Sequence, residues 1–422
     1  MSSEAQVYVW IYLPGTTEPV VAGRFSHVRT AGGGVGSFVY GKSYLGRPNA
    51  VPLDPVALPL HKKPFSTTHL SGWFSALLDA GPDDWGKRLI DRLHGPQETL
   101  GYLLLARGQS VGALAFSTDP SVPPLNHGHV PGIDSLERLF DLHRAIEAGE
   151  SVADEDRDLL LQGTSAGGAR PKTTIAHDAA LWLAKFTSTS DNRDQPPVPT
   201  MEGALLTVAE ACGIRVPRHR VVNVGDATVL LVERFDRERL ADGRFARRRY
   251  VSARTVLWSR PEVQGYSYMG SYTNLARQMR VWERTPSEDI RELFRRIAFN
   301  CLVGNTDDHD CNTGFLADVH GFFSLSPAFD LTARPATPRM FLAMGFGENG
   351  GEVSWSNLLS EPEMFGYERD EAVDMVRSQW TIVQETVVDR MVVNGCNERL
   401  AVGALRAMPG NKLIGDMPQR SS

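Results

Sequence analysis

Residues 304–316 read GNTDDHDCNTGFL, and three carboxylates, one imidazole and two carboxamides lie within nine consecutive positions of this stretch. The apolar run IAFNCLV at 297–303 predicts a helix that holds the following loop rigid. Three roles suit so many oxygen-bearing side chains: a metal loop, a catalytic loop, or an acidic turn whose side chains cap backbone groups.

A calcium loop of the EF-hand type is the first alternative. Asp308, Asp310 and Asn312 have the spacing of its first three ligands. The sixth position, which needs glycine, is Thr313, and the twelfth, which needs glutamate, is Val319. The loop therefore lacks both defining residues.

Phosphoryl transfer is the second alternative, because it needs a carboxylate that receives the hydroxyl proton and an amide oxygen that holds magnesium. Protein kinases separate these groups by five positions, with the aspartate first. Asp307 and Asn312 have this separation. Asp330, in FFSLSPAFDLT, follows a short strand-like run. It is either a second magnesium-binding carboxylate or a residue that caps a helix or turn.

Segments that precede the acidic loop carry groups suited to binding a nucleotide. GTSAGG at 163–168 lies between two predicted strands, and its small residues let backbone N–H groups approach phosphate. Lys185 follows an apolar strand, where a buried ammonium needs an anionic partner such as phosphate. Glu202 opens the next predicted helix and either orients Lys185 or complements the helix dipole. Backbone groups of Glu233 and Phe235, in LLVERF, are expected to face an adenine edge.

The glycine-rich stretch has two rival interpretations. A Walker loop is excluded, since Ala169 follows Gly168 in place of the required Lys-Ser/Thr pair. GTSAG also matches the G-x-S-x-G elbow of serine hydrolases, with Ser165 as nucleophile. That elbow needs a strand, a turn and a helix, whereas GARPKTTIAHDAALWLAKF predicts a strand, a turn and a strand.

Composition and charge narrow the class of protein. A chain of 422 residues with 42% hydrophobic residues can bury a large core, and its length suggests two or three structural units. The net charge of -6 gives no overall basic field, so direct DNA binding is disfavoured. No signal peptide or apolar run of about 20 residues is apparent, so we expect a cytoplasmic protein with no membrane partner.

The cysteines favour a reducing compartment, because Cys212, Cys301, Cys311 and Cys396 form no C-x-x-C pair. A zinc site from Cys301, His309 and Cys311 matches no common spacing, and buried apolar cysteines are the better prediction.

The order of predicted elements divides the chain into three units: residues 1–125 with mixed strands and short helices, 126–236 rich in strands, and 237–422 mostly helical. Within the second unit, DLLLQG at 158–163 is predicted as a strand. Asp242-Gly243 predicts a hairpin turn, and the three arginines at 247–249 on its returning arm are predicted to form a solvated face.

Taken together, TSAGGARPK, LAKF, VERFDR, GNTDDHDCN and PAFDLT resemble the HipA-type serine/threonine kinase toxins of bacterial toxin-antitoxin modules. FVYGKSYLGRPNAVPLDPVALPL, GWFSALLDAGPDDWGKRLIDR and GQSVGALAF look like the N-terminal subdomain of the long family members, so the resemblance covers nearly the whole chain. It implies an α+β, two-lobed protein-kinase-like fold, with a strand-rich N-lobe, a helical C-lobe and an additional small N-terminal α/β subdomain.

The resemblance also implies residue roles. Asp307 is the expected catalytic base, Asn312 and Asp330 the magnesium ligands, Lys185 the phosphate lysine and His309 a partner near the nucleotide. The loop residues Ser165, Ala166, Gly167 and Gly168 are expected to bind the nucleotide.

Ser165 matches the serine that family members autophosphorylate, which is thought to withdraw the loop from the site and inactivate the kinase. This chain departs from the best-known family members at two places. Arg170-Pro171-Lys172 replaces their Gln-Glu-Lys in the loop, and Phe329 stands where they have tyrosine.

The implied cofactors are ATP and magnesium. The implied partners are a small DNA-binding antitoxin of the HipB type, which would supply any DNA contact, and a protein substrate, commonly glutamyl-tRNA synthetase among aminoacyl-tRNA synthetases. Two other functions stay open: an inactive kinase-like corepressor, and a small-molecule kinase, because Asp307-x-His309-x-x-Asn312 also resembles the loop of lipid kinases.

Overall fold

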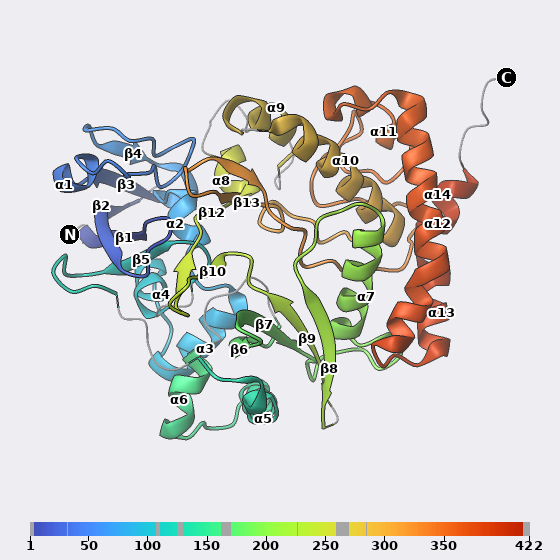
Figure 1. Cartoon of the computed structure of the whole chain (residues 1–422), viewed down its shortest axis with the longest axis horizontal. Helices are drawn as coiled ribbons and strands as arrows, with labels where there is room; N and C mark the ends of the chain where they lie inside the picture. The colour runs from blue at the N-terminus through green and yellow to red at the C-terminus, as the bar shows by residue number, and fades with distance from the viewer. Residues whose placement is uncertain are drawn as a thin grey trace.

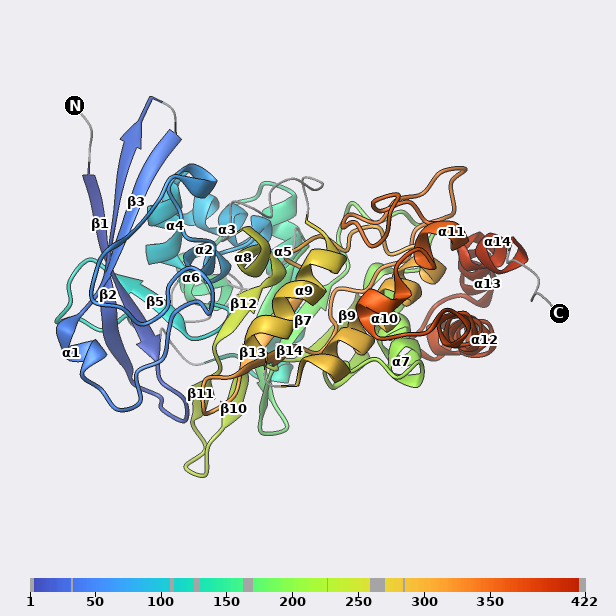
Figure 2. The same ribbon diagram turned by 90° about the horizontal axis from the view of Figure 1, so that it is seen from above.

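The computed structural model describes residues 4–31, 33–106, 110–124, 130–161, 170–225, 227–258, 270–283 and 285–416. Three regions lie in a row, with the N-terminal sheet at one end and the last helices at the other (Figures 1 and 2). The second and third regions meet at helix α7 (Val198–Ala211), which lies between a sheet and the long helix α12 (Arg369–Val393).

The N-terminal module is built on an antiparallel five-stranded sheet with the order β4-β3-β2-β1-β5. Aromatic residues of the sheet and of nearby loops, including Trp10, Phe25, Phe38 and Trp73, form its core. The strands are β1 (Glu4–Tyr12), β2 (Pro19–Thr30), β3 (Gly33–Tyr40), β4 (Phe65–Thr67) and β5 (Leu114–Ser117). The helices are α1 (Lys42–Leu45), η1 (His69–Ser71), α2 (Ser75–Asp79), α3 (Asp84–His94) and α4 (Thr99–Leu105).

The second region contains an antiparallel four-stranded sheet with the order β6-β7-β9-β8. Its strands are β6 (Lys172–His177), β7 (Ala180–Phe186), β8 (His219–Val224) and β9 (Ala227–Glu233). It is preceded by η2 (Ile133–Ser135), α5 (Leu136–Glu147) and α6 (Asp154–Leu161). The strand prediction for DLLLQG was wrong, because its leucines complete α6; a short apolar run does not distinguish a strand from a helix end.

Helix α7 belongs to the second region by sequence but shares its core with the third. Ala204, Leu205, Leu206 and Val208 are buried in one cluster with residues of the C-terminal helices. The helix ends as its sequence predicts, because Gly213 follows the cap residue with a φ of 75°.

The third region is mostly helical, and the predicted helical patterns beyond residue 270 are confirmed. Helix α10 (Pro286–Val303) runs through the core of this region. The apolar side chains of the helix and several of its polar side chains are buried. The other helices are α8 (Ala253–Trp258), α9 (Tyr272–Trp282), α11 (Trp355–Leu358), η4 (Pro362–Phe365), α13 (Glu398–Ala407) and α14 (Gly410–Gly415). A small sheet, ordered β12-β13-β14, contains Tyr250–Ser252, Gly314–Ala317 and Phe323–Leu325.

Two short strands, β10 (Arg237–Arg239) and β11 (Phe245–Arg247), form the hairpin that Asp242-Gly243 predicts. The arginines after its turn are not a solvated face. Arg247 and Arg249 are 5% and 4% exposed; Arg247 lies over the Tyr12 ring, and Arg249 donates to the carbonyl of Pro52. Arg247 thus stacks on the N-terminal module, whereas Arg249 stacks on Phe323 and reaches that module through its hydrogen bond. A guanidinium can cover aromatic surface while its N–H groups find carbonyl partners.

Among the helices in the described ranges, none has both the length and the apolar character that crossing a membrane requires.

Candidate functional site

The acidic loop starts where α10 ends. Gly304 caps this helix with a φ of 78°, and a Cβ atom there would lie 2.4 Å from the carbonyl oxygen of Arg334. Glycine is therefore required both by the backbone conformation and by the space. The chain turns at this point into residues 305–313 and continues as β13.

Two of the three loop carboxylates hold the loop in place. Asp308 is 3% exposed and accepts hydrogen bonds from the Tyr272 hydroxyl and the Ala343 amide, both at 2.7 Å. Burial raises the pKa of Asp308 to about 7. Asp310 is fully buried and accepts two N–H groups of Arg254, at 3.0 and 2.8 Å. The capping role considered for the whole stretch thus applies to Asp308, which accepts a backbone amide, whereas Asp310 forms an ion pair.

Asp307, by contrast, is exposed at the surface of the loop. The Asn312 side-chain amide donates to the Asp307 carbonyl at 2.7 Å, which joins the two ends of the five-residue spacing. The His309 ring accepts the Cys311 amide at 3.3 Å. The loop thus presents one accessible carboxylate, and the Oδ1 atom of Asn312 is the group of that side chain suited to a cation.

The second part of the site is a buried cluster around Lys185, which lies on β7. Its ammonium donates to Glu202 on α7 at 2.6 Å and to Asp330 at 2.9 Å. Burial opposes the charge of Lys185, but the carboxylates of Asp330 and Glu202 outweigh it and raise the pKa of Lys185. Glu202 therefore orients the lysine, as one of the two sequence interpretations predicts.

Asp330 has a left-handed backbone, with a φ of 58°. Aspartate tolerates this conformation better than most residues do, and it directs the side chain toward Lys185. Burial opposes ionisation of Asp330, but the ammonium groups of Lys185 and Lys172 outweigh it and keep the pKa of Asp330 below its ordinary value. Asp330 is therefore an ionised carboxylate.

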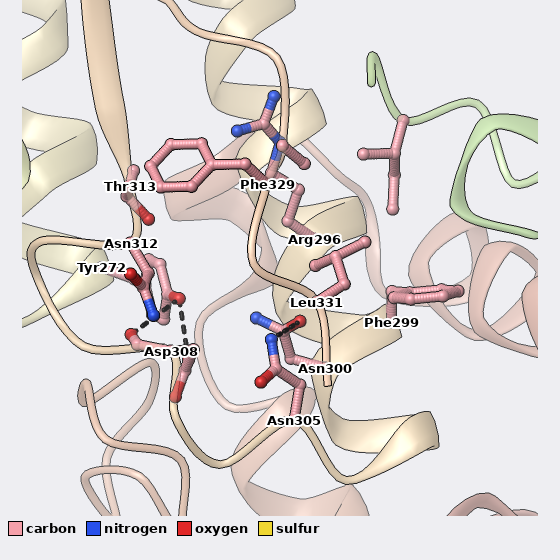
Figure 3. A pocket seen from close by; sticks show the side chains of 12 residues that line it. Tyr272, Arg296, Phe299, Asn300, Asn305, Asp308, Asn312, Thr313, Phe329 and Leu331 are labelled. Carbon is pink, nitrogen blue, oxygen red and sulfur yellow. Dashed lines mark hydrogen bonds between the residues drawn. The ribbon is translucent and has the colours of Figure 1, made fainter. Parts of the chain in front are cut away.

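One pocket brings the acidic loop and the Asp330 segment together. Asp308, Asn312 and Thr313 line it from the loop, and Phe329 and Leu331, the neighbours of Asp330, line it from the other side (Figure 3). Side chains of α10, among them Asn300, form its floor. The acidic loop and the Asp330 segment thus line the same pocket, whose wall combines polar side chains of the loop with apolar side chains such as Phe329 and Leu331.

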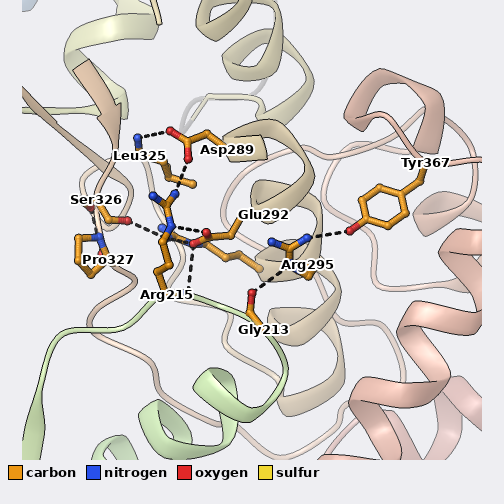
Figure 4. A network of polar contacts seen from close by, with 10 residues as sticks. Gly213, Arg215, Asp289, Glu292, Arg295, Leu325, Ser326, Pro327 and Tyr367 are labelled. Atoms are coloured by element: carbon orange, nitrogen blue, oxygen red, sulfur yellow. Dashed lines mark hydrogen bonds and ion pairs between the residues drawn. The ribbon is translucent and has the colours of Figure 1, made fainter. Parts of the chain in front are cut away.

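Helix α10 also holds the chain that leads to Asp330 (Figure 4). Glu292 accepts from Arg215, which follows α7, and from Arg296, whose other N–H group donates to the Ser326 carbonyl at 2.6 Å. Asp289 accepts from Arg215 and from the Leu325 amide. This network, defined here as the α10 clamp, ties the end of α7 to residues 325 and 326.

Glu233 ends β9 and Phe235 lies in the connector that follows, and the backbone groups of both are predicted to face an adenine edge. The Glu233 side chain pairs with Arg218, and its amide donates to the Arg218 carbonyl at 2.8 Å, so that N–H group is already used. The Phe235 ring lies 5.6 Å from the Phe329 ring. This contact places the connector beside the segment that carries Asp330.

The proposed loop residues Ser165, Ala166, Gly167 and Gly168 lie outside the described residues. Their described neighbours are informative for the hydrolase alternative: α6 precedes the motif and β6 follows it. A nucleophile elbow needs a strand before and a helix after its serine, which is the reverse order.

Within the described ranges, a cluster with atoms close enough to hold a metal consists of His309, Asp310 and Cys311. Cys301 is not part of it and is buried in the α10 core, as predicted for an apolar cysteine. One of these three groups, Asp310, already pairs with Arg254, and the spacing of the cluster matches no common zinc site.

Sequence reasoning missed several residues of this site. Tyr272, Arg254 and Arg215 hold the loop and the Asp330 segment, and none of them belongs to a recognisable motif. Lys172 was noticed only as the last residue of TSAGGARPK, with no role of its own, yet it lies opposite Lys185 on the neighbouring strand and pairs with Asp83 of the N-terminal module. An ammonium at the start of an otherwise buried strand was the signal for it.

Two family models match the chain: the HipA-like C-terminal domain over residues 164–387 and the HipA N-terminal domain over residues 20–117. The chain therefore belongs to the HipA family.

The chain is also similar to two kinase relatives and to a solved structure, and the latter likeness bears on the fold. Putative kinase Y4mE of Sinorhizobium fredii is 26% identical over 345 residues, which cover 77% of this chain and 79% of the relative. Putative kinase Y4dM of the same organism is 28% identical over 163 residues, 36% of each chain. HipA from the Shewanella oneidensis MR-1 complex of HipA, HipB and operator DNA matches with a TM-score of 0.66 at 18% identity, over 97% of this chain and 96% of the other. The predicted α+β kinase-like fold is confirmed.

Proposed function

We propose that this protein is an ATP- and magnesium-dependent serine/threonine protein kinase and the toxin of a HipBA-like toxin-antitoxin module. The observation that carries the proposal is the buried Lys185–Glu202–Asp330 cluster: the two neighbours of Asp330, Phe329 and Leu331, line one pocket with Asn312 of the acidic loop. Kinases need this set of groups: a lysine oriented by a glutamate, two oxygen ligands for magnesium, and a carboxylate base.

Each group has a definite task in the proposed reaction. The Asp307 carboxylate accepts the proton of the substrate hydroxyl, whose oxygen bonds to the γ-phosphorus while the bond to the β–γ bridging oxygen breaks and ADP leaves. Lys185 binds phosphate oxygens, and His309 lies near the nucleotide. Backbone groups of Glu233 and Phe235 would meet the adenine edge.

The residues present fit magnesium. Asn312 and Asp330 would hold it, since an ionised carboxylate and an amide oxygen are the hard ligands that magnesium prefers, and their segments face the same pocket. The metal supplies positive charge to the phosphates when it is bound.

The glycine-rich loop, Ser165 to Gly168, would cover the phosphates, with Ser165 as an autophosphorylation site. A HipB-like antitoxin is the proposed partner, as in the complex of the Shewanella relative, and DNA would be bound through it. An aminoacyl-tRNA synthetase, with the glutamyl enzyme as first candidate, is the proposed substrate in the bacterial cytoplasm. Residues 1–125, 126–236 and 237–422 are the proposed domains, with α7 packed across the second boundary.

Incubation of the purified protein with labelled ATP, magnesium and a bacterial lysate tests the proposal. We expect phosphorylated serine or threonine in a protein, with wild type active and Asp307→Asn inactive although it still folds. Transfer only to small molecules or lipids would replace the protein-kinase assignment, and nucleotide binding without any transfer would favour the corepressor. Undiminished transfer by Asp307→Asn would remove this residue from its role.

A further inference from the structure

The junction between strand β12 and helix α8 contacts both the N-terminal module and the acidic loop. Ser252 ends β12, and α8 begins at the next residue. The module's helix α2 contacts both of these elements (Figures 1 and 2). Ser252 and Thr255, on the two sides of the junction, are 2% and 0% exposed. The junction is therefore a buried link between segments that lie far apart in the sequence.

Asp79, the last residue of α2, makes the contact from the N-terminal module. Its Oδ2 atom accepts the Ser252 amide at 2.8 Å and the Thr255 hydroxyl at 2.6 Å, and its Oδ1 atom accepts the Ser252 hydroxyl at 2.7 Å. Burial raises the pKa of Asp79, and the hydrogen bonds from Thr255 and Ser252 oppose that effect. Both oxygens of Asp79 thus fix the point at which the strand becomes the helix.

The same junction holds the acidic loop. The Ala253 amide donates to the Thr313 carbonyl at 2.7 Å, and the Arg254 amide donates to the Asp310 carbonyl at 3.0 Å. The Arg254 guanidinium adds two hydrogen bonds to Oδ1 of Asp310, at 3.0 and 2.8 Å. The first two residues of α8 therefore bind the loop through its backbone and through one buried carboxylate.

The groups with proposed tasks in the reaction depend on this attachment. Asn312 lies between Asp310 and Thr313, the two loop residues that α8 holds. The Asn312 side-chain amide donates to the Asp307 carbonyl at 2.7 Å, so a shift of Asn312 also moves Asp307. Supporting contacts of this kind matter because a displacement of about 1 Å in a catalytic group can cost about 100-fold in rate.

We propose that Asp79 is a positioning residue: through α8 and the Arg254–Asp310 pair, it holds the acidic loop in the geometry for phosphoryl transfer. This inference rests on the proposed kinase function and deepens it, because the N-terminal module becomes part of the catalytic unit. Asp79 acts on the reaction only through the places that it gives to Asp307 and Asn312.

The N-terminal module is also attached by contacts that do not involve Asp79. The Gly112 amide donates to Asp236 at 2.9 Å, and Arg237 donates to the Ser110 carbonyl at 2.8 Å. These contacts join the module to the segment after β9, away from α8. A change at Asp79 therefore alters the support of the acidic loop while the module stays attached.

Three variants separate positioning from the other effects of a substitution. Asp79→Ala removes all three acceptor contacts. Asp79→Asn is the conservative variant, because its oxygen can accept from the Ser252 amide and the Thr255 hydroxyl while its nitrogen donates to the Ser252 hydroxyl. Asp84→Ala is the matched control: it removes a carboxylate of the same module that pairs with Lys87 at 3.6 Å and is 73% exposed.

Magnesium-dependent autophosphorylation of the full-length protein with γ-labelled ATP gives the rate constant of transfer at saturating ATP. The same assay over a range of magnesium concentrations gives the concentration for half of the maximal rate. Calorimetric titration with adenosine measures base binding alone. Thermal unfolding of each variant sets an assay temperature at which all of them are folded.

We expect the rate constant of Asp79→Ala to fall on the order of 10- to 100-fold, because the carboxylate base is misplaced. The magnesium concentration for half of the maximal rate should rise, and the adenosine affinity should be unchanged. A purely structural role would lower the melting temperature but leave the kinetic constants of the folded protein unchanged. Asp79→Asn and Asp84→Ala should match wild type.

Arg254→Gln should also slow transfer, and the double variant Asp79→Ala/Arg254→Gln should lose no more than the larger single loss, because both residues act along one route. A rate constant of folded Asp79→Ala equal to that of wild type would overturn the inference alone. If Asp79→Ala does not fold, Thr255→Val decides, since it removes one of the three donors; an undiminished rate would then overturn the inference. Absence of transfer by wild type would overturn both the inference and the proposed function.

Discussion

Replacement of Glu292 by glutamine should break the α10 clamp at its centre. The Glu292 side chain is 4% exposed and accepts from two arginines, of which Arg296 is 8% exposed and Arg215 48% exposed. Glutamine keeps the shape but removes the only charge of this side chain. We therefore expect the free energy of unfolding to fall, chiefly because the buried Arg296 loses its anionic partner.

The magnitude follows from the burial of each partner. Removal of one member of a buried ion pair costs about 3–5 kcal/mol. We take the lower end, about 3 kcal/mol, because the Ser326 carbonyl still accepts from Arg296. The half-exposed Arg215 adds less than about 1 kcal/mol, since water screens its interaction. With an unfolding entropy of about 2.1 cal/mol/K per residue, a chain of 422 residues loses about 1 °C for each kcal/mol, so the melting temperature should fall by roughly 3–4 °C.

The pKa of Glu292 sets the direction in which the stability difference between wild type and Glu292→Gln changes with pH. Burial opposes the charge of Glu292, but Arg296 and Arg215 outweigh it and hold the pKa of Glu292 below its ordinary value of 4.5. The stabilisation is therefore complete above pH 4.5 and is lost as the pH falls through the folded-state pKa. The difference between wild type and Glu292→Gln should be constant from pH 8 to about 5 and shrink below that.

Thermal unfolding at several pH values, followed by circular dichroism, measures this difference. Glu288→Gln is the control, because Glu288 lies exposed in the first turn of the same helix and should change the stability by less than about 1 kcal/mol. Equal melting temperatures for wild type and Glu292→Gln at pH 7, or a difference that grows in acid, would refute the reasoning.

Three further outcomes are expected. Asp330→Ala should weaken nucleotide binding in the presence of magnesium far more than in its absence, and ATP titrations with equal losses in both conditions would contradict its role as a ligand. Mass spectrometry after incubation with Mg-ATP should find phosphate on Ser165 in wild type but not in Asp307→Asn, while a fluorophosphonate probe should leave Ser165 unlabelled; labelling would revive the hydrolase. Asp308→Asn should become more stable relative to wild type as the pH rises from 4 to 7, because the raised pKa of Asp308, about 7, means that ionisation of this buried carboxyl opposes folding; parallel stability curves would argue against this.

Several sequence predictions were accurate because they depend on neighbours along the chain. The helix before the acidic loop and the hairpin at Asp242-Gly243 both follow from local periodicity and turn chemistry. The prediction of a strand at 158–163 failed for the same reason, since three consecutive leucines satisfy either element and only packing of α6 against α3 and α5 chooses between them.

The sequence by itself determined the chemistry of the candidate site, because Asp307, Asn312, Lys185 and Asp330 occur in short motifs whose residue types and spacing can be read directly. Only the tertiary structure decided which charges are buried and with whom. Asp308 and Asp310 differ from Asp307 solely through partners that other elements supply, and the pair of Asp83 with Lys172 joins two modules. Charge pairing depends on distance and burial, which distant segments set when they pack together.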